Sequence, residues 1–103
     1  MRVVIAEQSM IYREYLVSKF IKRGHEVLLT DIGIVPVSEF DFYITDYCIE
    51  SQAVLDALDK PDRCVVILNE VTRQNTVSVD AIRFMKSFDS AQVDRFIHSL
   101  EEK

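Results

Sequence analysis

The sequence predicts an α/β fold, in which helices cover a mostly parallel β-sheet. Short, continuously apolar runs alternate with longer amphipathic stretches along the 103 residues, as buried strands alternate with helices in such folds. Glycine occurs only twice, which excludes the glycine-rich loops that bind nucleotide phosphates. A chain of this length forms one domain, so we expect residues 1–103 to be a single domain.

Five apolar runs predict the strands of this sheet. Residues 2–6 are apolar and rich in β-branched side chains after Arg2, as is typical of a strand buried on both faces. The other runs are residues 27–29, 42–45, 65–68 and 81–85. The carboxyl ends of parallel strands meet at one edge of the sheet, and α/β sheets bind ligands there.

Amphipathic stretches predict the helices. The first follows Ser9, a favoured capping residue, and ends at Gly24. Its predicted buried stripe is Tyr12, Leu16 and Phe20, widened by Ile11 and Tyr15. Residues 51–58 predict a second helix. The last helix begins after Asp89, which forms a capping-box pattern with Gln92. Its predicted buried face is Val93, Phe96, Ile97 and Leu100.

Charge and composition narrow the class of partner. Lys and Arg total 12 against 17 Asp and Glu, a net charge of −5, which argues against binding to nucleic acid or to anionic membranes. The longest apolar run, residues 64–68, is too short to span a bilayer, and the first residues do not form a signal-peptide pattern. Two cysteines without CxxC spacing suggest a reducing compartment. We therefore expect a cytoplasmic protein.

Polar residues follow the predicted strands at the carboxyl edge. Glu7 and Gln8 follow the first strand, Asp46 the third, Asn69 the fourth and Lys86 the fifth. Carboxylates that hold Mg²⁺, with a lysine facing them, suit phosphoryl binding. A simpler interpretation is that these residues only terminate strands, with Lys86 and Asp46 forming a structural ion pair.

These residues resemble the receiver domain of two-component response regulators, over nearly the whole chain. The resemblance rests on the run Val-Val-Ile-Ala-Glu-Gln-Ser at 3–9, on Asp-Phe-Tyr-Ile-Thr-Asp at 41–46, and on Lys86-Ser87-Phe88, which is similar to the family's Lys-Pro-Phe. It implies a flavodoxin-like, CheY-like three-layer sandwich with a five-stranded parallel sheet. It also implies that Asp46 accepts a phosphoryl group from a histidine kinase, that Glu7 and Asp46 hold Mg²⁺, and that Lys86 senses the phosphate.

Departures from the family pattern predict weakened phosphoryl chemistry. Gln8 replaces an acidic metal ligand, so the affinity for Mg²⁺ should fall. Asn69 replaces the family's hydroxyl residue, and Glu70 brings a carboxylate that would repel a phosphoryl group. Arg83 stands at the aromatic switch position. Ser87 replaces proline, so the cis peptide bond that aims the family's lysine is expected to be absent.

Two helices of the family are expected to be lost or shortened. Residues 31–40 contain Gly and Pro, so the second helix should be reduced. Residues 70–80 have no helical stripe, so the fourth helix should be missing or replaced by a loop. The surface formed by the fifth strand and the last helix would then be rebuilt, and it is a candidate homodimer interface.

Three functions from different classes follow. We favour a degenerate receiver that acts mainly as a protein-interaction module, with an output protein as partner and weak or absent phosphorylation at Asp46. The alternative is a working Mg²⁺-dependent receiver. The third is a small flavodoxin-like enzyme or redox protein, for which Cys48 could supply a thiol, although buried, inert cysteines are commoner. The sequence shows no cofactor loop or nucleophile–base pair, and no metal or catalytic partner for His25 or His98, so we expect no enzymatic activity.

Overall fold

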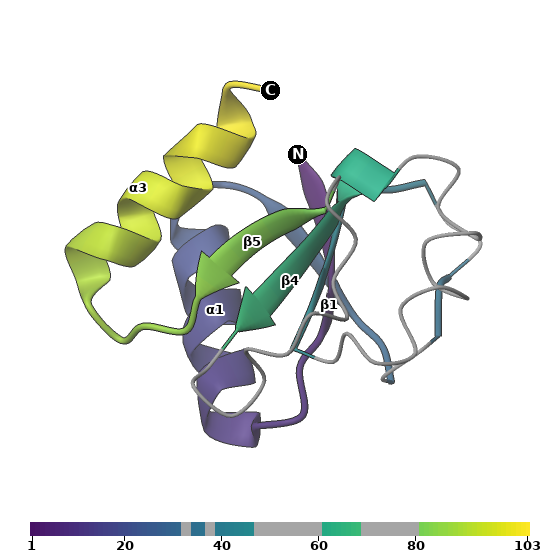
Figure 1. The fold of residues 1–103 in the computed structure, drawn as a ribbon, viewed down its shortest axis with the longest axis horizontal. Helices are drawn as coiled ribbons and strands as arrows, with labels where there is room; N and C mark the ends of the chain where they lie inside the picture. The colour runs from purple at the N-terminus through teal and green to yellow at the C-terminus, as the bar shows by residue number, and fades with distance from the viewer. Residues whose placement is uncertain (32–33, 37–38, 47–60, 69–80) are drawn as a thin grey trace.

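The computed structural model of the chain describes residues 1–31, 34–36, 39–46, 61–68 and 81–103 (Figure 1). The strands are β1 Arg2–Ala6, β2 Glu26–Leu29, β3 Phe42–Thr45, β4 Cys64–Leu68 and β5 Ile82–Met85. The α-helices in the described residues are α1 Met10–Lys22 and α3 Ser90–Glu101, and a 3₁₀ turn, Pro61–Arg63, precedes β4. The helix predicted at 51–58, the segment 70–80 and three residues singled out from the sequence (Cys48, Asn69 and Glu70) lie outside the described residues.

The five strands form one parallel sheet in the order β2-β1-β3-β4-β5. This order is that of flavodoxin-like sheets, in which β1 is flanked by β2 and β3. Val3 marks the register of the central strands, because it pairs with Val27 on one side and Phe42 on the other. The predicted α/β class with a five-stranded parallel sheet is therefore confirmed.

Both described helices pack on the same face of the sheet (Figure 1). The stripe of α1 is buried as predicted, with Tyr12, Leu16 and Phe20 fully inaccessible to solvent. The face of α3 is also the predicted one: Val93, Phe96, Ile97 and Leu100. The prediction that Ile11 widens the stripe of α1 was wrong, because Ile11 is 74% exposed. Successive helical residues point about 100° apart, so Ile11 lies to one side of the stripe.

The opposite face of the sheet carries a smaller cluster. Its buried members are Val4, Ala6, Tyr43, Cys64, Val66 and Ala81. Val35 and Phe40, from the connection between β2 and β3, pack against this cluster. The described residues of 31–40 contain no helix, as expected for a reduced second helix.

Side-chain caps define where the two helices begin. The Ser9 hydroxyl accepts a hydrogen bond from the Tyr12 amide at 3.3 Å, and the Asp89 carboxylate accepts one from the Gln92 amide at 3.0 Å. After α1, Gly24 adopts a φ of 84°, a left-handed conformation that favours glycine. Neither described helix is long and apolar enough to cross a membrane.

Candidate functional site

The sheet brings Glu7, Gln8, Asp46 and Lys86 to its carboxyl edge, as the sequence predicts. Glu7 and Gln8 follow β1, Asp46 follows the neighbouring β3, and Lys86 follows β5. The Gln8 amide donates a hydrogen bond to Asp46 Oδ1 at 3.3 Å. Asp46 is half-buried, whereas Gln8 is exposed.

Glu7 is a buried acid at this edge, with a side chain that is 0% exposed. Its Oε2 accepts a hydrogen bond from the Ser9 amide at 2.8 Å. Its Oε1 lies 3.8 Å from Lys86 Nζ and has no hydrogen-bond partner among the described residues. Burying a carboxylate without full pairing costs several kcal/mol, so the ionised form of Glu7 is disfavoured here.

The environment of Glu7 favours its protonated form. Burial, and after it the adjacent Asp46 carboxyl, raise the pKa of Glu7 from 4.5 to about 7. The Ser9 amide and the Lys86 ammonium act in the opposite direction. Burial is the largest of these causes, because desolvation penalises the charged form. Glu7 therefore titrates near neutral pH.

Lys86 is directed toward Glu7. Among the described residues, the ion pair that Lys86 makes is the one with Glu7, and no ion pair joins it to Asp46. Its Nζ also lies 4.8 Å from the centre of the Tyr12 ring, within the range of a cation–π contact. The Lys86 amide donates to the Leu68 carbonyl at 2.7 Å, which extends the contact between β4 and β5. The structural ion pair considered from the sequence is thus formed with Glu7 instead of Asp46.

The loop after Lys86 is held without a cis peptide bond. The described part of the chain contains none, as expected from serine at position 87. The Ser87 amide donates to the Tyr12 hydroxyl at 3.2 Å, and the Ser87 hydroxyl donates to the Gln92 side chain at 2.8 Å. The Ser87 hydroxyl also accepts a hydrogen bond from the Asp89 amide at 3.0 Å. Ser87 therefore links Lys86 to the start of α3. In the capping box predicted for Asp89 and Gln92, its hydroxyl bridges the Gln92 side chain and the Asp89 amide.

The described residues at this edge fit a hydrated Mg²⁺ ion poorly. Mg²⁺ keeps several of its waters and is usually bound through one or two accessible carboxylates. Glu7 is fully buried, its Oε2 already accepts from Ser9, and its Oε1 faces the Lys86 ammonium. In the described parts of the chain, no group of three or more His, Cys, Asp or Glu side chains is arranged to hold a metal.

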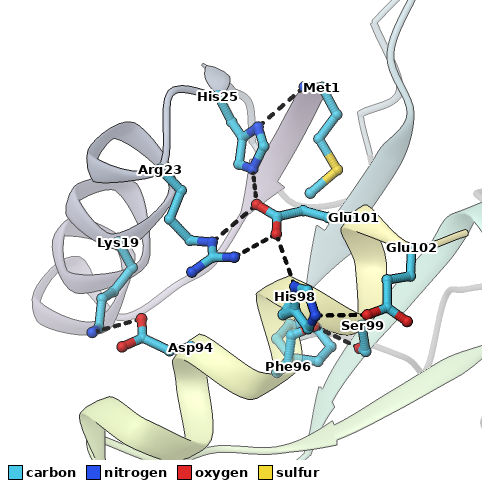
Figure 2. A network of polar contacts seen from close by, with 10 residues as sticks. All are labelled: Met1, Lys19, Arg23, His25, Asp94, Phe96, His98, Ser99, Glu101 and Glu102. Carbon is cyan, nitrogen blue, oxygen red and sulfur yellow. Dashed lines mark hydrogen bonds and ion pairs between the residues drawn. The ribbon is translucent and has the colours of Figure 1, made fainter.

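A second polar cluster lies at the opposite, amino edge of the sheet (Figure 2). Its centre is Glu101 near the end of α3, which accepts hydrogen bonds from both Arg23 Nε, at 2.9 Å, and Arg23 Nη2. His25 Nε2 lies 2.5 Å and His98 Nδ1 lies 3.4 Å from the same carboxylate. Chiefly because of Arg23, and then His25, the pKa of Glu101 falls to about 2.

This second cluster, and the contacts of Tyr12 in the first, were not predicted from the sequence. His25 and Glu101 are 76 positions apart, and no local pattern joins them. Tyr12 was assigned to the core from its spacing alone. A signal for its further contacts was the residue type, because a buried tyrosine hydroxyl usually finds a hydrogen-bond partner.

Comparison with known proteins adds no relative to this description. No protein-family model matches the chain, no curated protein matches it, and no solved structure matches it. The resemblance to known proteins is therefore one of fold alone, and it rests on the order of the strands.

Proposed function

We propose that this chain is a cytoplasmic receiver-like signalling domain that acts mainly as a protein-interaction module, with weak or absent phosphorylation at Asp46. The observation that carries the proposal is the direction of Lys86. In a phosphoryl-accepting site, this lysine would neutralise the charge that arrives at Asp46. Here its ammonium lies 3.8 Å from Glu7 and 4.8 Å from the Tyr12 ring.

The environment of the acids at the carboxyl edge supports the proposal that Mg²⁺ binds only weakly. A metal ion would have to displace the proton that Glu7 binds near neutral pH, and it would have to reach a side chain that is fully buried. Gln8 contributes an exposed amide in place of a third carboxylate. Each of these features lowers the affinity of the site for a hard, hydrated cation.

A working receiver remains the alternative function. It is favoured by the placement of Glu7, Asp46 and Lys86 at one edge of a sheet with the strand order 2-1-3-4-5. In that function a histidine kinase is the partner and Mg²⁺ is required. A small flavodoxin-like enzyme is a more remote alternative, and we propose no enzymatic activity because no described feature favours one.

The surface of β5 and α3 is the interface that we propose for a protein partner, either an output protein or a second copy of this chain. A shallow groove there is lined by Arg83, Phe84, Met85, Gln92, Arg95 and Phe96. Phe84 and Phe96 stack with ring centres 4.1 Å apart, and Met85 is 51% exposed. Met and aromatic side chains beside arginine are enriched at protein interfaces.

An NMR titration tests the phosphoryl function directly. Amide spectra of the wild type and of Asp46→Asn are recorded with Mg²⁺ up to millimolar concentration and then with beryllofluoride, a phosphoryl mimic. The proposal predicts small, unsaturated shifts around residues 7, 46 and 86. Saturable shifts that disappear in Asp46→Asn would overturn the proposal in favour of a working receiver.

A matched variant shows whether the altered positions weaken the site. Gln8→Asp restores the missing carboxylate at the exposed end of β1. If the loss of this ligand is the reason for weak binding, Gln8→Asp should respond to a lower Mg²⁺ concentration than the wild type. Ser18→Asp, which adds a carboxylate at an exposed position of α1, is the control for a general effect of charge.

A further inference from the structure

We infer that Tyr12 is a positioning residue that holds Lys86 at the carboxyl edge and directs its ammonium toward Glu7. The functional meaning of this inference rests on the proposed function, because Lys86 matters as the lysine of a weakened phosphoryl site. The contacts that support it come from three consecutive residues of the loop between β5 and α3. All three are made to a single side chain of α1.

The first contact fixes the backbone next to Lys86. The Tyr12 hydroxyl accepts a hydrogen bond from the Ser87 amide at 3.2 Å. Ser87 follows Lys86 directly, so this bond restrains the peptide group that joins the two residues. Proline at position 87 has no N–H and could not make this bond.

The second contact restrains the lysine side chain itself. Lys86 Nζ lies 4.8 Å from the centre of the Tyr12 ring, and it lies 3.8 Å from Glu7 Oε1. The ring face is negative and the carboxylate is an anion, so both attract the ammonium. With Lys86 only 23% exposed at its side chain, these two groups determine where the charge lies.

The third contact packs Phe88, in the same loop, against α1. The Phe88 ring meets the Tyr12 ring edge to face, with centres 5.1 Å apart and planes at 82°. Tyr15 supports the same loop from the next turn of α1, because its hydroxyl donates to the Phe88 carbonyl at 3.1 Å. Lys86, Ser87 and Phe88 are therefore held together against α1.

These contacts distinguish Tyr12 from an ordinary core residue. Leu16 and Phe20 occupy the same stripe and are equally inaccessible, and their side chains have no polar group. A leucine at position 12 could fill much of the space. It would leave the Ser87 amide without its acceptor and the Lys86 ammonium without its ring.

Two substitutions separate the two restraints. Tyr12→Phe keeps the ring and removes the acceptor hydroxyl, whereas Tyr12→Leu removes both. Tyr43→Phe is the matched control, because Tyr43 is also fully buried and its hydroxyl donates to the Ile34 carbonyl on the other face of the sheet. Amide and lysine side-chain NMR spectra are recorded without Mg²⁺ or beryllofluoride, and the dispersion of the remaining amides shows that each variant is folded.

The expected result follows from the position of Lys86 near the ring. The ring current shifts the ε-methylene protons of Lys86 upfield in the wild type, and this shift persists in Tyr12→Phe and is lost in Tyr12→Leu. The Ser87 amide exchanges with solvent faster in both variants, and neither signal changes in Tyr43→Phe. A folded Tyr12→Phe protein with an unchanged Ser87 amide, or a wild-type Lys86 with the shifts of an exposed lysine, would overturn the inference.

Failure of this inference is distinguishable from failure of the proposed function. The positioning of Lys86 is measured in the protein alone, whereas the phosphoryl function is measured by the response to Mg²⁺ and beryllofluoride. If Lys86 is held by Tyr12 and the protein also binds Mg²⁺ and beryllofluoride, the inference stands and the proposed function fails. If Lys86 is mobile and neither ligand binds, the inference fails and the proposed function stands.

Discussion

Two glutamates at opposite edges of the sheet show how differently one fold treats the same side chain. Glu7, at the carboxyl edge, is fully buried and faces one ammonium at 3.8 Å, and its pKa rises to about 7. Glu101, at the amino edge, is contacted by Arg23, His25 and His98, and its pKa falls to about 2. Burial dominates the first case, and hydrogen bonding by Arg23 dominates the second.

The difference indicates separate roles for the two edges. The partners of Glu101 come from the end of α1, from the start of β2 and from α3 itself, so the cluster ties α3 to the rest of the domain. Glu7 opposes stability when it is ionised, and such groups tend to occur at functional sites. The amino edge therefore stabilises the fold, whereas the carboxyl edge is where a functional site is expected.

Glu7→Gln should produce the largest change in stability. Because the pKa of Glu7 is raised from 4.5 to about 7 in the folded state, the folded protein holds this proton more tightly than the unfolded chain. The stability that this provides is complete below about pH 4.5 and is lost as the pH rises through about 7. Glutamine is neutral throughout, so the variant should be more stable than the wild type by about 2–3 kcal/mol at pH 8 and by much less at pH 5.

Urea denaturation at pH 5 and at pH 8 measures this effect. Glu14→Gln is the control, because Glu14 is an exposed glutamate on α1, and it should change stability little at either pH. A difference between Glu7→Gln and the wild type that is the same at both pH values would contradict the raised pKa.

Lys86→Met should have an intermediate effect that depends on pH. At pH 8 the variant loses the cation beside ionised Glu7 and should be less stable than the wild type by about 1 kcal/mol. At pH 5 Glu7 is protonated, and the loss should become small. Lys22→Met, at an exposed position of α1, is the control for the loss of a lysine.

A double-mutant cycle identifies the partner of Lys86. If Glu7 is the partner, Lys86→Met should cost little in the Glu7→Gln background and should keep its full cost in the Asp46→Asn background. The reverse pattern would show that Lys86 is coupled to Asp46, as in the simpler interpretation of the sequence.

Glu101→Gln should have the smallest effect, because solvent screens the partly exposed pairs of the amino edge. The sign is opposite to that at Glu7. A lowered pKa stabilises the protein above about pH 4.5, and this contribution is lost as the pH falls toward 2. The variant should melt below the wild type at pH 7, and thermal denaturation between pH 7 and pH 3 should show the two converging. A gap that widens toward pH 3 would rule out the stabilising role.

Elements with one strong local signal were predictable from the sequence. The bounds of β1 and β3 agree with residues 2–6 and 42–45, because a run of buried, mainly β-branched or aromatic residues has few alternatives. The caps of both helices were also predictable, since Ser9 and Asp89 act on amides three residues away. Ile11 was misplaced because periodicity gives the direction of a stripe better than its width.

The candidate site was predictable only as an order of polar residues along one edge. Strand order places Glu7, Asp46 and Lys86 together, whereas the partner of each depends on side-chain reach across strands. The contacts of Lys86 with Tyr12 and with Glu7 join residues more than 70 positions apart in sequence. Such contacts leave no local pattern, so the pairing of Lys86 with Glu7 could not be read from the chain.

The place of β1 between β2 and β3 has a consequence for synthesis on the ribosome. Residues 1–29 carry β1, α1 and β2, and these elements can pair as soon as they emerge. The second edge of β1 stays unpaired until residues 42–45 are made, and part of the buried stripe of α1 stays uncovered until α3 is made. At about 5–20 residues per second, the strand edge stays unpaired for roughly one to three seconds, and the helix face stays partly uncovered for longer. A chaperone would have that interval in which to bind the nascent chain.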